Sequence, residues 1–198
     1  MKLSRLFLLL AALLAAWQIA IGIDGLESVP VLAYTVAFGV LLVACLLLII
    51  LGLGVLESPI VVVVSTIIPL GLSLGLVWEH GGEWRGPYAL FATLGFLAVL
   101  ITRSLPLKGK LPVLVLAVVH GISGLVIFLL PTILAANGTT HAGFALVGLG
   151  GALIGLGGLL LSFLKAGRPI LSKETILNVL PPLLFLMTMC FVAGFRFG

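Results

Sequence analysis

The sequence predicts an all-α integral membrane protein with seven transmembrane helices, and three observations lead to this class. Of the 198 residues, 62% are hydrophobic and only 8% are charged, too few charges to cover the surface of a soluble domain. The apolar residues fall into seven runs, and ~20 helical residues cross the ~30 Å hydrocarbon core of a bilayer. The basic residues gather between alternate runs. Since no polar linker separates two parts, we expect one membrane domain, residues 1–198, with short loops.

The first run covers residues 5–22 and follows a basic start, so it has two interpretations. A secretory signal peptide begins in the same way. However, the alanines are followed by Trp17, Gln18 and Ile19, which do not make a small-residue cleavage site. We therefore expect the run to be the first transmembrane helix.

The second run, residues 30–56, continues almost directly into the third, residues 59–78. Only the short stretch from Gly52 to Pro59 interrupts the apolar pattern. Proline is favoured at the first position of a helix, so Pro59 predicts the start of a new helix after a tight turn. The two runs are therefore predicted to form a helical hairpin.

Four further runs complete the prediction. The fourth, residues 87–101, is the shortest, and Trp84 at its start is typical of the aromatic belt at a membrane surface. The remaining three are residues 111–135, 142–164 and 175–195.

The distribution of basic residues predicts the orientation. With the N-terminus in the cytoplasm, eight of the ten basic residues fall on the cytoplasmic side: Lys2, Arg5, Arg103, Lys108, Lys110, Lys165, Arg168 and Lys173. Only Arg85 and Arg196 fall outside. This bias follows the positive-inside rule, so we expect the C-terminus on the outer side. We expect the protein to reside in a bacterial inner (plasma) membrane. The net charge of +4 therefore reflects orientation and does not predict nucleic-acid binding.

Small residues at helical spacing predict where helices pack closely. Lipid tails provide no hydrophobic drive for helix association, so glycine and serine stripes commonly mark the interfaces. The longer stripe lies in the sixth run and the shorter in the third: Gly148, Gly151, Gly155, Gly158 and Ser162, then Gly71 and Gly75.

His120 is the polar residue that lies deepest in an apolar run, about nine residues or ~14 Å from the start of residues 111–135. Ser123 is three residues further and shares its helix face. The pair could serve as a proton relay or a polar gate, and His120 could ligate haem or chlorophyll. The alternative is a neutral imidazole that joins helices through Ser123 or a carbonyl. A bis-histidine haem held by this chain alone is not expected, because no second histidine lies at that depth.

Two weaker candidates lie nearer the ends of the runs. His80 and His141 fall on the same side as Glu79 and Glu83, and these side chains suit zinc or copper. Their spacing matches no known ligand pattern, and polar residues at helix ends are ordinary. Asn178 precedes Pro181 and Pro182 in the last run, where freed carbonyls could line a cavity or simply accompany a kink.

The sequence carries no recognisable catalytic motif, so we expect a non-enzymatic protein. The first expectation is an accessory subunit or scaffold of a membrane complex, in contact with the lipid bilayer and with other membrane subunits or copies of itself. The second is a small transporter or proton-conducting protein that uses His120 and Ser123. The third is a redox subunit that binds haem or a pigment through His120, although the sequence itself requires no cofactor.

Overall fold

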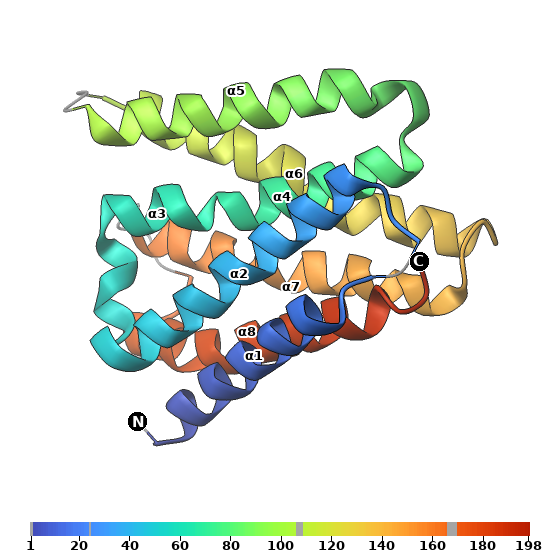
Figure 1. Ribbon diagram of the computed structural model, residues 1–198. Helices are drawn as coiled ribbons and strands as arrows, with labels where there is room; N and C mark the ends of the chain where they lie inside the picture. Colours follow the sequence, from blue (N-terminus) through green and yellow to red (C-terminus); the bar gives the residue numbers. More distant parts are fainter. Residues whose placement is uncertain (1, 24, 106–108, 166–169) are drawn as a thin grey trace.

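The computed structural model describes residues 2–23, 25–105, 109–165 and 170–198, and every regular element in these ranges is helical (Figure 1). The α-helices are α1 (Lys2–Ile21), α2 (Ser28–Leu51), α3 (Pro59–Ser65), α4 (Ile67–His80), α5 (Arg85–Ser104), α6 (Leu111–Ala136), α7 (Ala145–Lys165) and α8 (Lys173–Gly194). Three 3₁₀ turns connect them: η1 (Leu53–Glu57), η2 (Gly82–Trp84) and η3 (Ala142–Phe144).

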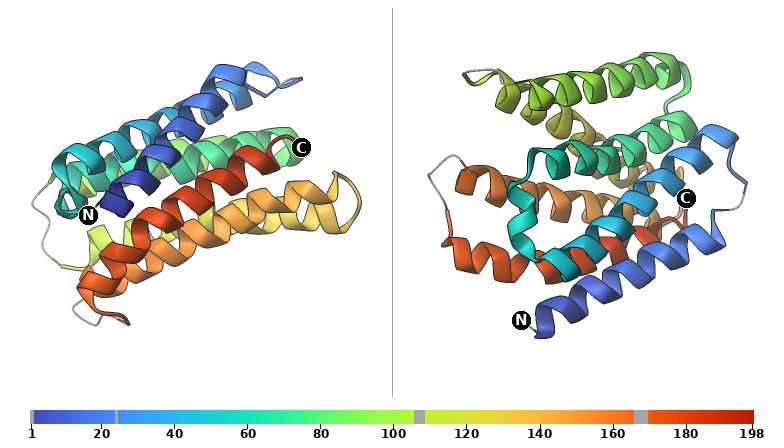
Figure 2. Two further views of the ribbon diagram at one scale, coloured as in Figure 1. Left: turned by 90° about the horizontal axis from the view of Figure 1, so that it is seen from below. Right: turned by 60° about the vertical axis from the view of Figure 1, so that its left-hand side comes forward.

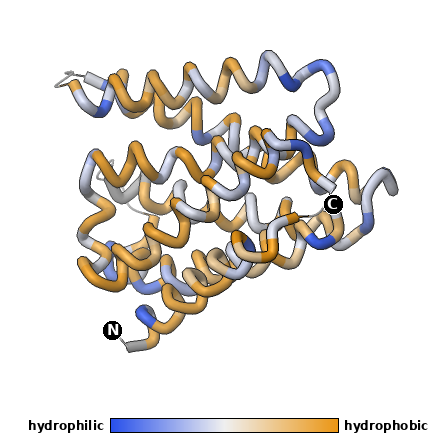
Figure 3. Tube along the Cα trace, viewed as in Figure 1, coloured by the Kyte–Doolittle hydropathy of each residue, from blue (hydrophilic) through white to orange (hydrophobic). Residues whose placement is uncertain are grey.

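Within the described ranges, seven helical segments are long and apolar enough to cross a membrane, which confirms the predicted number of spans. Pro59 opens a helix after the turn η1, as its position in the sequence predicts. The fourth span is longer than predicted, Gly82–Ser104, because the helix continues through the polar residues at both of its ends. Hydrophobic residues follow the helices, and hydrophilic residues lie mainly at the helix ends (Figure 3).

The third span is divided into α3 and α4 at Thr66. Pro69 has no N–H, so it cannot bond to the carbonyl of Ser65, which precedes the break. The hydroxyls of Thr66 and Ser65 both donate to the carbonyl of Val62, at 2.8 and 3.0 Å. Hydroxyls that bond to backbone in this way compete with the regular helix. Both effects act at the same turn and explain the break.

Six of the spans form a closed ring. In the order α1, α2, α4, α6, α7 and α8, each helix packs against the next, and α8 packs against α1. Large side chains fill the interior of this ring, and each has an exposed fraction of 2% or less: Phe38, Leu72, Phe144, Met187 and Phe191.

Helix α5 lies outside the ring and packs on α3, α4 and α6. It forms one edge of the bundle, as Figures 1 and 2 show. A second, smaller apolar cluster joins it to these helices: Val63, Leu70, Ala92, Val99 and Val119. The chain therefore consists of a six-span ring and one peripheral span.

Close helix contacts occur at glycines on α4 and α7. A Cβ at Gly71 would lie 2.8 Å from the carbonyl oxygen of Ala33, so α4 and α2 approach through their backbones. A Cβ at Gly151 would lie 2.8 Å from Cγ2 of Ile127 on α6. These are positions where only glycine fits without movement of a neighbour.

The other glycines of the two stripes fall into two groups, one in close contact with a neighbouring helix and one without such contact. Gly75 lies against the ring of Tyr34, and Gly148 lies against the carbonyl of Phe128. A Cβ at Gly155 or Gly158, by contrast, would have no heavy atom within 4 Å. The side chain of Ser162 lies outside the described part of the structure. Close contact is therefore concentrated in the half of α7 that follows η3.

The seven spans place the two chain ends at opposite ends of the bundle (Figure 1). We call the N end the one where α1 begins, with η1, Lys110 and Lys173. The C end carries η2, η3 and Phe195–Gly198. Lys108 and Arg168, which the sequence places with the N-end charges, lie outside the described residues.

Candidate functional site

The face of α5 that is turned toward the ring carries four polar residues: Arg85, Tyr88, Thr102 and Arg103. Arg85 and Arg103 are 18 residues apart, which is five turns of an α-helix, so they share one face. Ala92 and Val99 on the same face are 6% and 0% exposed, and they pack against the ring. These four polar residues therefore lie along the contact of α5 with α4 and α6.

Three hydroxyls meet at this contact, one from each helix. The hydroxyl of Tyr88 on α5 faces those of Ser73 on α4 and Ser123 on α6. Both serines are 0% exposed. Ser73 donates its proton to the carbonyl of Pro69 at 2.6 Å, whereas the oxygens of Tyr88 and Ser123 are buried and make no hydrogen bond. The three hydroxyls are therefore close enough to act on one another, and those of Tyr88 and Ser123 lie buried at this point.

His120 lies one turn nearer to the N end than Ser123, on the same face of α6, as the spacing predicts. Its Nδ1 is buried without a hydrogen-bond partner. The guanidinium of Arg103 lies close enough for its charge to act on the imidazole. The contact of α5 with His120 and Ser123 therefore extends from the middle of the span toward the N end.

We call these six residues the polar seam: Ser73, Arg85, Tyr88, Arg103, His120 and Ser123. Among the described residues, eight side-chain polar atoms are buried without a hydrogen bond, and five of these belong to the seam. Leaving such a group unsatisfied costs ~1–3 kcal/mol. The remaining three belong to Gln18, His80 and Thr140. The unsatisfied polar groups are therefore concentrated where α5 meets the ring.

Asn178, the third predicted polar candidate, lies elsewhere. It is on an exposed face of α8, and α8 packs on α1 and α7. The structure therefore brings His120 and Ser123 together with Tyr88 and Ser73 and leaves Asn178 apart from them.

A second polar pair lies toward the C end of the ring. The hydroxyl of Tyr34 on α2 donates to Oε2 of Glu79 on α4 at 2.6 Å. Tyr34 is 3% exposed, and its ring packs against Phe195 with the centroids 4.6 Å apart. Phe195 also contacts Phe38 and Phe144, so aromatic rings surround the pair. A carboxylate hydrogen bond of this length is of the strong, charge-assisted kind.

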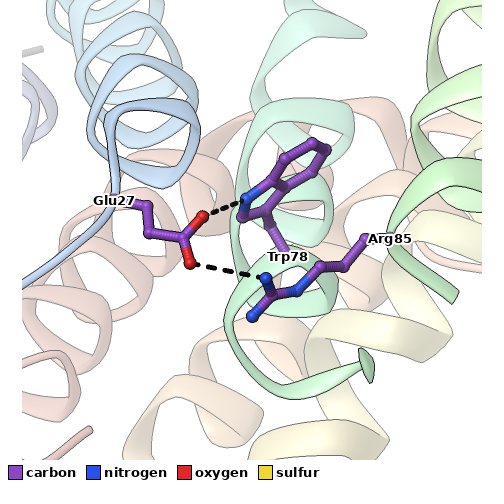
Figure 4. A network of polar contacts seen from close by, with 3 residues as sticks. All are labelled: Glu27, Trp78 and Arg85. Carbon is purple, nitrogen blue, oxygen red and sulfur yellow. Dashed lines mark hydrogen bonds and ion pairs between the residues drawn. The ribbon is translucent and has the colours of Figure 1, made fainter. Parts of the chain in front are cut away.

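A third polar network lies at the rim of the C end (Figure 4). Glu27, just before α2, accepts a hydrogen bond from Nε1 of Trp78 at 2.9 Å and pairs with Nη1 of Arg85 at 3.4 Å. The Glu27 and Arg85 side chains are 62% and 39% exposed. Exposed pairs of this kind stabilise proteins by only ~0–1 kcal/mol. The network therefore positions the start of α5 more than it stabilises the fold.

The four residues predicted for a metal site have separate surroundings. The His80 ring packs against Phe144 at 5.4 Å, whereas Glu79 bonds to Tyr34. The ring of His141 stacks on Phe197, and its Nδ1 accepts a hydrogen bond from the Gly143 N–H at 3.0 Å. Glu83 is exposed in η2. Within the described ranges, no three His, Cys, Asp or Glu side chains form a group that could hold a metal ion.

Sequence reasoning did not identify Tyr34, Tyr88 or Ser73 as site residues. A signal for Tyr88 is present in the sequence, since Tyr88 shares one face of α5 with Arg85 and Arg103. Tyr34 and Ser73 offer no such signal, because their partners are on other helices.

The seven apolar helices indicate an integral membrane protein. Comparison with protein-family models, with curated proteins and with solved structures found no match to this chain.

Replacing Tyr34 by phenylalanine tests the Tyr34–Glu79 pair. The change leaves a partly buried carboxylate without its donor, so we expect the free energy of unfolding to fall by ~1–3 kcal/mol. Glu79→Gln keeps an acceptor and should cost less. A double-mutant cycle by denaturant unfolding in mixed micelles should give a coupling of about 1–2 kcal/mol. Thr93→Val, at an exposed residue of α5, is the control, and strictly additive effects at Tyr34 and Glu79 would exclude the interaction.

Proposed function

We propose that this chain is a small transporter or proton-conducting protein and that the polar seam is its path through the membrane. The observation that carries this proposal is the row of buried atoms without hydrogen bonds: Nδ1 of His120, Oγ of Ser123 and Oη of Tyr88. These atoms lie between Arg103 toward the N end and Arg85 at the C end. Polar groups at membrane depth that lack a structural partner are typical of ion and substrate pathways.

The packing of the ring supports a path at its edge. Large apolar and aromatic side chains fill the ring interior, and the most buried of them are 0–2% exposed. The contact between α5 and the ring differs, because hydroxyls, an imidazole and two guanidiniums replace part of the apolar packing there. A polar species therefore meets a lower barrier along this contact than through the ring.

The chemistry of the seam suits a relay of protons as well as passage of a small solute. An imidazole exchanges protons near neutral pH, and hydroxyls both donate and accept hydrogen bonds. Water between His120, Ser123 and Tyr88 would complete a continuous chain of such groups.

Flux through proteoliposomes tests this proposal. We expect purified wild-type protein to accelerate either proton entry, followed with entrapped pyranine, or permeation of small solutes, followed by light scattering. His120→Ala and Ser123→Ala should each lower that flux about tenfold, the effect of ~1.4 kcal/mol on a barrier. Asn178→Ala, which changes an exposed polar residue of α8, should leave the flux unchanged. Wild-type vesicles that are no more permeable than empty ones to any probe would rule the proposal out.

A second candidate function, an accessory subunit or scaffold of a membrane complex, is supported by the outer surface of α5 and α6. An apolar groove lies between these two helices. Its lining residues are Phe91, Leu94, Gly95, Ala98, Leu114, Val115, Val118 and Val119. Such a groove fits an apolar helix of another subunit.

Photo-crosslinking in native membranes tests this second candidate. Leu94 lines the groove and is 55% exposed, and Leu186 on α8 is 43% exposed at a distant surface. If a subunit occupies the groove, a photoreactive residue at position 94 should capture a single protein that co-purifies after mild extraction. The same residue at position 186 should not. A chain that always purifies alone and crosslinks only to lipid would exclude the accessory role.

We further propose that the N end faces the cytoplasm of a bacterial cell and that the chain resides in the inner membrane. The proposal is supported by Arg5, Arg103, Lys110 and Lys173 near the N end, whereas the rim of the C end carries Glu27 with Arg85.

Labelling of intact cells checks the orientation. Both native cysteines are buried, so cysteines introduced at exposed positions should report accessibility. A membrane-impermeant maleimide should label Thr139→Cys in intact cells and Lys110→Cys only after permeabilisation. The reverse pattern would invert the topology, and recovery outside the inner-membrane fraction would contradict the localisation.

A further inference from the structure

We infer that a cavity between α1 and α2 binds the hydroxyl group of an amphipathic alcohol, a molecule with one free hydroxyl on an alkyl chain. The cavity lies near the C end, where α1 ends and the chain crosses to the start of α2 (Figure 1). The polar seam belongs to α4, α5 and α6, so the inference does not depend on the proposed function.

The cavity is bounded by both helices and by the segment that joins them. Its volume is about 20 Å³, and its lining includes Gln18, Ile19 and Ile23 from the first helix and its end, and Val31 and Thr35 from α2. Val31 is 44% exposed, and Thr35 is exposed as well. The cavity therefore opens on the outer surface of the bundle, between the two helices.

Gln18 supplies the polar group of the cavity. Its side chain is 3% exposed, and its Nε2 donates to the carbonyl of Gly22 at 3.0 Å. This bond fixes the orientation of the amide, because exchanging its nitrogen and oxygen would bring two acceptors together. No group among the described residues donates to Oε1 of Gln18, which is buried. A guest that donates a hydrogen bond would satisfy this acceptor.

The lining favours a neutral donor over a charged one. None of the described residues around the cavity carries a charge. The nearest carboxylate that the lining contacts is that of Glu79, which accepts its hydrogen bond from Tyr34. Burying an ammonium group beside apolar side chains without a counter-charge is costly. A hydroxyl group meets the need of Gln18 without that cost.

The lining also favours an alcohol over water. A buried water commonly makes about three hydrogen bonds and needs at least two polar partners. The hydroxyl of Tyr34 is already bonded to Glu79, and the Gly22 carbonyl already accepts from Gln18. An alcohol satisfies Oε1 of Gln18 with its single proton, and its alkyl chain removes apolar surface from contact with polar groups.

The volume determines which part of the guest enters. About 10–15 Å³ is enough for one water-sized group, so a cavity of about 20 Å³ takes a hydroxyl and the carbon that carries it. The rest of the chain would lie over Val31 on the outer surface. A phosphate or a sugar is too large. A diacylglycerol with a free hydroxyl and a free alkanol both present the group that fits.

Photolabelling of the purified full chain tests the site. An octanol that carries a diazirine is the probe, and an alkylamine-oxide detergent keeps other hydroxyls out of the sample. We expect mass spectrometry to find the label within residues 18–38, which include the lining residues. Gln18→Leu keeps the approximate size of the side chain and removes the acceptor, so labelling should fall about tenfold, the effect of one buried hydrogen bond on affinity. Thr93→Ala removes an exposed hydroxyl of α5 and should leave labelling unchanged.

Competition on the wild-type chain gives a second measurement that does not depend on the variants. Excess 1-hexanol should displace the probe, whereas hexyl methyl ether, which has no proton to donate, should displace it about tenfold less well. Equal displacement by the alcohol and the ether, label found only outside residues 18–38, or undiminished labelling of Gln18→Leu would overturn the inference.

The source of the hydroxyl is distinguished by a third competitor, dioctanoylglycerol. Displacement of the probe by this lipid as well as by hexanol would identify a lipid hydroxyl as the guest, and displacement by hexanol alone would identify a soluble alcohol. Displacement by neither would overturn the site. Gln18→Leu leaves the polar seam unaltered and should not change the flux into vesicles, so the failure of either proposal is seen separately from that of the other.

Discussion

Polar groups inside a bilayer have no water to bond to, and this constraint governs the arrangement of side chains in the protein. Apart from Ser123, the buried serines and threonines of the described chain satisfy it locally by donating to the carbonyl four residues earlier. Ser73, Thr102 and Thr188 do so at 2.6–2.7 Å. Ser123 is fully buried and makes no such bond. Because the local solution is available to any helical serine, its absence at Ser123 marks the residue as different from the others.

The spans and their number were predictable because they depend on local composition. Each apolar run is long enough to span, and proline and glycine mark the hairpin before Pro59, so no long-range contact is needed to find them. The relation between His120 and Ser123 was also predictable, since both lie on one helix and three residues apart. These properties follow from the period of the α-helix alone.

The pairings between helices were not predictable in this way. Tyr34 and Glu79 are 45 residues apart, and Glu27 and Trp78 are 51 apart, so only the folded ring brings them together. Adjacent residues on a helix also point in directions ~100° apart. For this reason Glu79 contacts α2 while His80 contacts Phe144, although the sequence groups them as potential ligands of one metal.

The position of the polar seam has a mechanical consequence. Only 17% of the residues in the apolar part of the α5 span are buried, the same share as in α6, compared with 50% in the span formed by α3 and α4. α5 is held by the small apolar cluster around Val99 and, at its start, by the exposed Glu27–Arg85 pair. Movement of α5 thus disturbs few buried contacts, whereas opening the ring would expose its aromatic interior. Because the unsatisfied polar groups lie at the boundary of this peripheral helix, access to them can change while the ring stays intact.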